Sequence, residues 1–147
     1  MARSASKGVR AYFRNEPREL ARLRETVEEF VAEANLDALT GHHVMLILEE
    51  LFTNVVKYSG GTSPAGAAAK GIMVGLDRKG SSIRIAFADD GAPFNPLAVP
   101  EPELDEEVEE RPIGGLGIHL VRSLTARASY QRAEGWNRLQ LVCLTDD

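Results

Sequence analysis

The sequence predicts an α/β two-layer sandwich, in which a mostly antiparallel mixed sheet carries its helices on one face. Apolar residues alternate with polar ones in five short segments and recur at helical spacing in three longer ones. The order is strand, helix, helix, two strands, loop, helix, two strands, which is not the regular alternation of a Rossmann domain. With 147 residues, 44% of them apolar, the chain has the size of one domain with one core.

The N-terminal part predicts one strand and one helix. Residues 1–8 are small and polar, which is typical of a flexible terminus. Alternation over residues 9–13 predicts the first strand. Asn15 and Pro17 then suit a helix start, and apolar side chains recur at helical spacing until about Asn35.

Residues from about His42 to Tyr58 predict a second, amphipathic helix. At about 100° per residue, its apolar side chains fall on one face and its polar side chains on the other, which only Leu46 interrupts. Glu50 and Asn54 are four residues apart, so they lie one above the other on the polar face. The apolar face packs on a core, and the polar face meets either water or a ligand.

The remaining elements are two hairpins and a third helix. Alternation over 72–76 and 83–87 predicts the first hairpin, and the segments on either side of Ala133-Glu134-Gly135-Trp136 predict the second. Between them lies an acidic stretch with four prolines over residues 96–112, which predicts an irregular loop. A glycine-rich stretch at 113–117 opens the third helix.

The composition limits the classes of partner. The net charge of −5 is concentrated in residues 101–110, which carry seven acids and no base. The chain has no dense basic stripe, so direct binding to nucleic acid is not expected. It has no apolar run long enough to span a membrane and no signal-peptide pattern, and its single cysteine, Cys143, fits a reducing compartment, so we expect a cytoplasmic protein. Cys143 continues the alternation of the last strand, which indicates a buried residue and not a nucleophile.

The polar face of the second helix is the first candidate site. The Glu50 carboxylate is suited to take a proton from an attacking hydroxyl, and the Asn54 amide oxygen is suited to ligate Mg²⁺. Taken alone, the same two residues also fit a solvated helix face, because charged side chains are mostly exposed.

Two further motifs point to a nucleotide. Asp89-Asp90-Gly91 follows a strand, where a carboxylate could accept a hydrogen bond from an exocyclic amine such as that of adenine, although a turn with two solvated aspartates fits as well. The glycines at 113–117 let the backbone approach phosphates at a helix N-terminus. Glycine turns before helices are common, and no Gly-Lys-Ser/Thr follows to make a P-loop.

In fixed order along the chain, these three motifs resemble those of the GHKL ATPases, which include histidine kinases, type II topoisomerases, mismatch-repair ATPases and heat-shock chaperones. The strings DDGAPFNP, GGLGIHLVRSL and EGWNRLQL are similar to those of the anti-sigma factor serine kinases of bacterial partner-switching systems. The resemblance covers about Val9 to Leu144 and implies a Bergerat-type ATP-binding fold in one domain, residues 9–147. In place of the last glycine that is usual in the first glycine box, this chain has Pro93.

The resemblance also implies ligands and roles. ATP or ADP would bind with Mg²⁺, Asn54 would ligate the metal, Glu50 would be the general base, and Asp89 would bind the adenine amino group. Residues 96–112 would form a lid over the nucleotide. The further nucleotide contacts that it implies are Lys57, Gly91, Pro93, Gly114, Gly115, Leu116, Gly117 and Asn137.

The implied function is a protein serine kinase that phosphorylates an anti-anti-sigma antagonist and, in the other state of the switch, holds a sigma factor; a homodimer is implied too. The alternative is a nucleotide-switched binding module that sequesters a sigma factor or another regulator without phosphotransfer. The catalytic half of a histidine kinase acting in trans is disfavoured, because no helical hairpin with a phospho-accepting histidine precedes the motifs. Arg18, Arg22 and Arg24 on the first helix form either a partner surface or a solvated face.

Overall fold

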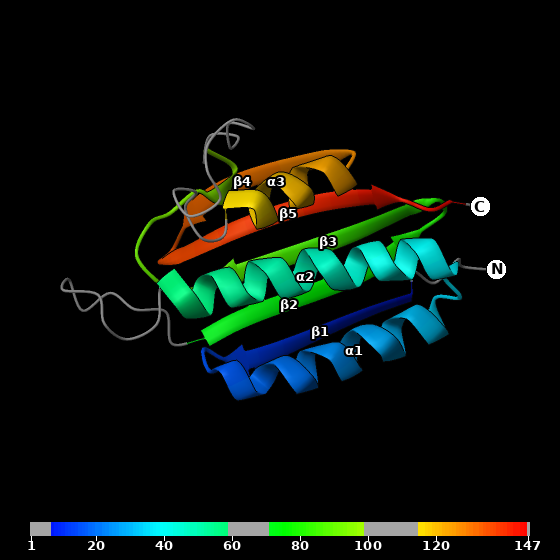
Figure 1. Cartoon of the computed structure of the whole chain (residues 1–147), viewed down its shortest axis with the longest axis horizontal. Coiled ribbons are helices and arrows are strands. Elements are labelled where there is room, and N and C mark those ends of the chain that lie inside the picture. The colour runs from blue at the N-terminus through cyan, green and yellow to red at the C-terminus, as the bar shows by residue number, and fades with distance from the viewer. Residues whose placement is uncertain (1–6, 59–70, 99–114, 147) are drawn as a thin grey trace.

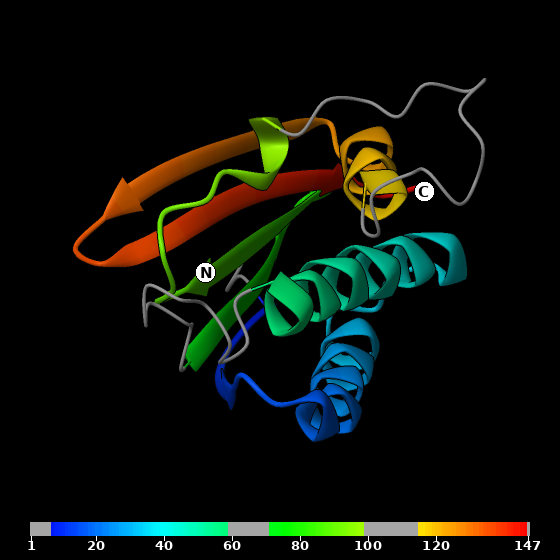
Figure 2. The ribbon, with the colours of Figure 1, turned by 60° about the vertical axis from the view of Figure 1, so that its left-hand side comes forward.

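The computed structural model describes residues 7–58, 71–98 and 115–146, which form a five-stranded sheet covered on one face by three α-helices (Figures 1 and 2). The strand order is β1-β2-β3-β5-β4. The two-layer sandwich is confirmed, although the described strands pair only antiparallel and not in the mixed pattern expected. The elements are β1 (Lys7–Arg14), η1 (Pro17–Glu19), α1 (Leu20–Glu33), α2 (Ala38–Tyr58), β2 (Gly71–Lys79), β3 (Ser82–Asp89), η2 (Pro96–Ala98), α3 (Gly115–Leu124), β4 (Arg127–Ala133) and β5 (Trp136–Leu144).

Both predicted hairpins are present, and each is closed by two residues. Lys79 pairs with Ser82 in the first, whose turn contains Gly80 at φ 61°. In the second, Glu134 and Gly135 have φ values of 53° and 85°. Positive φ at both central residues is the geometry of a type I′ turn, which matches the twist of antiparallel strands. The second turn fixes the register that brings β4 beside β5 at the candidate site.

The second helix begins at Ala38, four residues before the predicted start. Asp37 caps it, since its Oδ2 accepts a hydrogen bond from the Thr40 backbone N–H at 2.9 Å and its Oδ1 accepts one from the Thr40 hydroxyl at 2.6 Å. Gly41 therefore lies inside the helix and does not precede it. A Cβ at Gly41 would lie 3.1 Å from Val31 Cγ1, so the glycine allows α1 and α2 to pack closely.

The first strand begins at Lys7, so Lys7 and Gly8 belong to the sheet and not to the flexible terminus expected for residues 1–8. The helix predicted from Pro17 to Asn35 is divided into η1 and α1. It ends before Asn35, whose φ of 55° cannot continue an α-helix.

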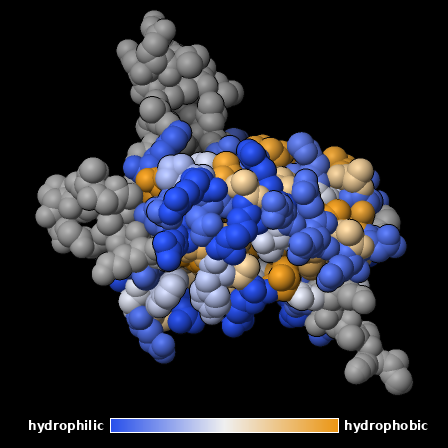
Figure 3. Space-filling view, turned by 90° about the horizontal axis from the view of Figure 1, so that it is seen from below, coloured by the Kyte–Doolittle hydropathy of each residue, from blue (hydrophilic) through white to orange (hydrophobic). Residues whose placement is uncertain are grey.

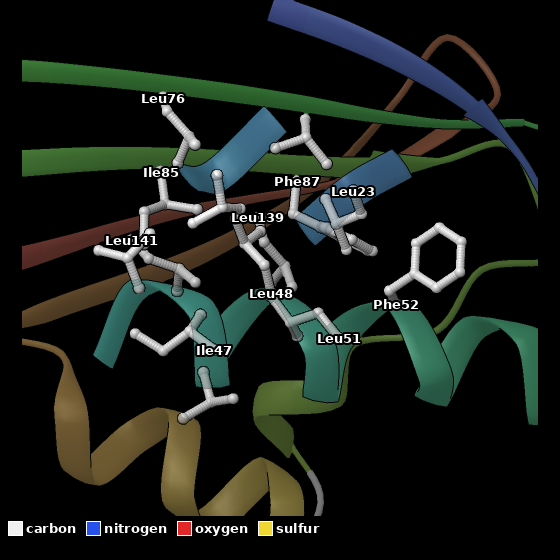
Figure 4. Packing of buried hydrophobic residues seen from close by; sticks show 14 of the residues in the cluster. Leu23, Ile47, Leu48, Leu51, Phe52, Leu76, Ile85, Phe87, Leu139 and Leu141 are labelled. Atoms are coloured by element: carbon white, nitrogen blue, oxygen red, sulfur yellow. The ribbon is translucent and has the colours of Figure 1, made fainter. Parts of the chain in front are cut away.

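The core lies between the sheet and α2 (Figure 4). Ile47, Leu48, Leu51 and Phe52 project from α2 toward buried side chains of β2, β3 and β5, as the apolar stripe predicted. Cys143 is part of this core, and its burial raises the pKa of its thiol to about 11. None of the helices in the described ranges is both long and apolar enough to cross a bilayer.

Candidate functional site

Two consecutive glutamates on α2 have different surroundings. Glu49 forms a hydrogen-bonded ion pair with Arg24 of α1. Glu50 is half-buried and makes no side-chain hydrogen bond or ion pair with the other described residues. The Glu50 carboxylate is therefore available to accept a proton, whereas the Glu49 carboxylate is held by a guanidinium.

Asn54 lies one turn after Glu50 and is also half-buried. Among residues 7–58, 71–98 and 115–146, its amide has no hydrogen-bond partner. It lines a recess between α2 and the sheet, and its amide oxygen is of the donor type that Mg²⁺ accepts beside phosphate oxygens. These properties fit the metal role inferred for Asn54.

The recess brings together residues that are far apart in the sequence. The recess is small, with a volume of about 20 Å³, and its walls come from α2, from the ends of β3 and β5, and from the segment after β3. Of the predicted site residues that the structure describes, Asn54, Asp89 and Asn137 line the recess, and Glu50 does not. The lining residues are Leu51, Asn54, Val55, Phe87, Asp89, Phe94, Pro96, Asn137 and Leu139.

Asp89, the last residue of β3, is only 8% exposed. Its Oδ1 accepts hydrogen bonds from the Gly91 backbone N–H at 2.9 Å and from Asn137 Nδ2 at 3.1 Å. Its Oδ2 accepts none from the part of the chain that the structure describes. Burial raises the pKa of this carboxyl group, and the two hydrogen bonds oppose that rise. A buried carboxylate with one oxygen in use and the other available is suited to receive an amino group from a ligand.

Asn137, near the start of β5, is 4% exposed and uses its whole amide within the protein. Its Nδ2 donates to Asp89 Oδ1 and, at 2.8 Å, to the carbonyl oxygen of Ala92. Its Oδ1 accepts from the Tyr130 hydroxyl at 2.6 Å, the Phe94 backbone N–H at 3.0 Å and Arg132 Nη1 at 3.2 Å. The side chain of Asn137 thus touches Asp89 and has no donor left for a ligand.

The other residues proposed as nucleotide contacts differ in their surroundings. Gly91 is buried beside Asp89, whereas Pro93 and Lys57 are exposed. Gly114 lies outside the described residues. The stretch from Gly115 to Gly117 forms the first turn of α3. Backbone N–H groups in a first helical turn have no partner inside the helix and are suited to bind phosphate.

Tyr130 and Arg132 were not singled out from the sequence. Both lie on β4, where Tyr130 pairs with Leu139 and Arg132 with Asn137. Arg132 Nη1 also donates to the carbonyl oxygen of Gly91 at 2.7 Å. The register of the hairpin about its two-residue turn would have placed Arg132 opposite Asn137, so the signal was present in the sequence.

The first residues of the predicted lid are attached to the body of the protein. Residues 96–98 form η2, in which Pro96 is buried and Leu97 packs against the core. Arg122 of α3 donates a hydrogen bond to the Leu97 carbonyl oxygen. The rest of the predicted lid, residues 99–112, lies outside the described residues.

The arginines of the first helical region are partly engaged within the protein. Arg22 donates to the Tyr12 carbonyl oxygen at 2.6 Å, forms an ion pair with Glu19, and lies 4.3 Å from the ring centroid of Phe13. Seen from the side of α1 and β1, the surface is mostly hydrophilic with scattered apolar spots (Figure 3). The two alternatives for Arg18, Arg22 and Arg24, a partner surface or a solvated face, stay predictions.

Comparison with known proteins finds relatives of this chain in sequence and in fold. The sequence profile of the family described as histidine kinase-like ATPase domain matches residues 13–143. Serine/threonine-protein kinase BtrW of Bordetella bronchiseptica is 32% identical over 97 residues, which are 66% of this chain and 66% of BtrW, just under two thirds of that protein.

Solved structures were compared with this chain, and one of them has the same fold. The RsbU and RsbW domains of Rv1364c from Mycobacterium tuberculosis superpose with a TM-score of 0.63 at 14% identity, over 94% of this chain and 32% of that one. A histidine kinase domain from Erythrobacter litoralis gives a TM-score of 0.46 at 15% identity, over 87% of this chain and 60% of that one. The first of these likenesses supports the arrangement of sheet and helices described above.

Proposed function

The chain belongs to the family of histidine kinase-like ATPase domains, and from this premise we propose that it is a Mg²⁺- and ATP-dependent protein serine kinase that also acts as an anti-sigma factor. Its relatives support the proposal, since BtrW is named a serine/threonine-protein kinase and the solved structure that this chain resembles contains an RsbW domain. The substrate would be a serine of an anti-anti-sigma antagonist, and a sigma factor would be held in the other state.

One observation carries the proposal: Asn54 and Asp89 line the same recess, although 35 positions separate them in the sequence. Asp89 Oδ2 would accept the adenine amino group, and the Asn54 amide oxygen would ligate the metal. The first turn of α3 would bind phosphate oxygens through its backbone N–H groups. A single nucleotide would thereby contact α2, β3 and α3.

Phosphoryl transfer depends mainly on positioning and charge neutralisation. Bound Mg²⁺ supplies positive charge against the phosphate oxygens. Glu50 accepts the proton of the serine hydroxyl as that oxygen bonds to the γ-phosphorus, and the bond to the β-phosphate oxygen breaks to leave ADP. Glu50 is suited to this because, among the described residues, no cation or donor holds its carboxylate.

The test compares two neighbouring glutamates. Glu50→Gln should abolish transfer of labelled γ-phosphate to an antagonist protein while leaving ATP binding largely intact. Glu49→Gln is the matched control, because it makes the same change on the same helix but at a carboxylate paired with Arg24. Transfer at the wild-type rate in Glu50→Gln would refute the role of Glu50.

The alternative function is that of a binding module that uses nucleotide only as a switch. Its supporting observation is that Glu50 does not line the recess that contains Asn54 and Asp89. Stable ATP occupancy without incorporation of phosphate on serine would favour this function.

Two further experiments address the binding partners. Capture from native cells with ATP or with ADP would identify the partner. Light scattering of the purified protein would test the proposed homodimer.

A further inference from the structure

The side-chain amide of Asn137, which lines the recess, is held in one orientation by its hydrogen bonds. Asn137 Oδ1 receives three donors, from Tyr130, Phe94 and Arg132. If the amide were turned over, its oxygen would face Asp89 Oδ1 and the Ala92 carbonyl oxygen, and its NH₂ group would face those three donors. Five contacts therefore agree on a single orientation.

The orientation of Asn137 decides which oxygen of Asp89 is available. With Nδ2 directed at it, Asp89 Oδ1 has two donors, from Asn137 and Gly91. The carboxylate group is thereby fixed, and Oδ2 is left as the acceptor on the wall of the recess. An ionised carboxylate accepts hydrogen bonds and cannot donate them, so the ligand must present a donor at that point, as an exocyclic amino group does.

We propose that Tyr130 and Arg132 are positioning residues for base recognition: they hold Asn137 in one orientation, which leaves Asp89 Oδ2 to receive the exocyclic amino group of an adenine nucleotide. Arg132 donates to Asn137 Oδ1 and also to the Gly91 carbonyl oxygen, so it holds the turn that follows Asp89 as well. Neither residue lines the recess, so Tyr130 acts through Asn137, and Arg132 acts through Asn137 and the Gly91 turn. The inference rests on the proposed binding of ATP and adds the residues that select its base.

The test measures the dissociation constants of ATP and of purine riboside triphosphate, which lacks the 6-amino group. The variant is Tyr130→Phe, which removes only the hydroxyl that donates to Asn137 Oδ1. Gln131→Ala is the matched control, because Gln131 is exposed on the same strand and alternates to the other face of the sheet.

Tyr130→Phe should weaken ATP binding about fivefold and leave the binding of purine riboside triphosphate unchanged. Gln131→Ala should change neither. Arg132→Gln is a second variant with the same expected selectivity. Unchanged ATP binding in both variants, or an equal loss for the two nucleotides, would overturn the inference while leaving the proposed function standing. A wild-type protein that binds neither nucleotide would overturn the proposed function and the inference together.

Discussion

Replacing Asn137 by alanine removes the side chain that joins β4, β5 and the segment after β3. Five hydrogen bonds are lost, with donors or acceptors on Asp89, Ala92, Phe94 and two residues of β4. Ala92 is half-buried and Phe94 is exposed, so water can replace part of what their backbone groups lose. Asp89 is 8% exposed, so water replaces little of its loss, and its Oδ1 keeps only the hydrogen bond from the Gly91 backbone N–H.

The expected loss of stability depends on which of these groups water can reach. A typical internal hydrogen bond contributes about 1 kcal/mol net, and a buried polar group left without its partner costs about 1–3 kcal/mol. Counting mainly the contacts of Asp89 and Tyr130, we expect the free energy of unfolding to fall by about 3 kcal/mol. For a domain of this size the melting temperature would then fall by about 6–12 °C.

Urea unfolding followed by circular dichroism at pH 7 would measure the change in Asn137→Ala. Gln131→Ala is the control, since an exposed substitution on the adjacent strand should stay within about 0.5 kcal/mol of wild type. If Asn137→Ala were as stable as the control, the amide would not hold the segment after β3, and its role in fixing Asp89 would have to be abandoned.

Three other predictions concern pH and the core. Because burial raises the pKa of Asp89, ATP affinity should fall on acidification at a pH above the ordinary carboxyl value of 3.8, and Asp89→Asn should weaken binding and remove this dependence in a titration. The hydrogen bond from Arg22 lowers the pKa of Glu19 from 4.5 to about 2, so ionised Glu19 stabilises the fold above pH 4.5 and that stability is lost as the pH falls toward 2. Glu19→Gln should therefore lower the free energy of unfolding at pH 7 by about 1 kcal/mol, a small value because the ion pair with Arg22 is partly exposed. Urea unfolding would contradict this if the difference from wild type did not shrink below pH 4.5. Phe52→Ala should lower the free energy of unfolding by about 3–5 kcal/mol, because Phe52 is fully buried. Leu39→Ala, at an exposed position of the same helix, should lower it by well under about 1 kcal/mol. Equal melting temperatures of the two variants would show the core assignment to be wrong.

The fold could be predicted from local patterns because its elements are regular. Alternation identified all five strands, helical spacing identified the three α-helices, and the turn residues marked both hairpins. Boundaries were less well predicted. The second helix was expected to start near His42, but Asp37 caps it and Gly41 lies inside it against Val31, a contact that only packing shows.

Sequence alone determined which residue types were available to the candidate site: the Glu50 and Asn54 pair on one helix, the acid at Asp89, and the glycine turn. It could not separate Glu49 from Glu50 by environment, because the ion pair with Arg24 joins residues 25 positions apart. The sequence also could not predict the hydrogen bonds of the Asn137 side chain, since its five partners lie on β3, β4 and the segment after β3. Only the tertiary structure decides which polar groups satisfy one another and which remain open to a ligand, because hydrogen bonds depend on distances across the fold and not on order along the chain.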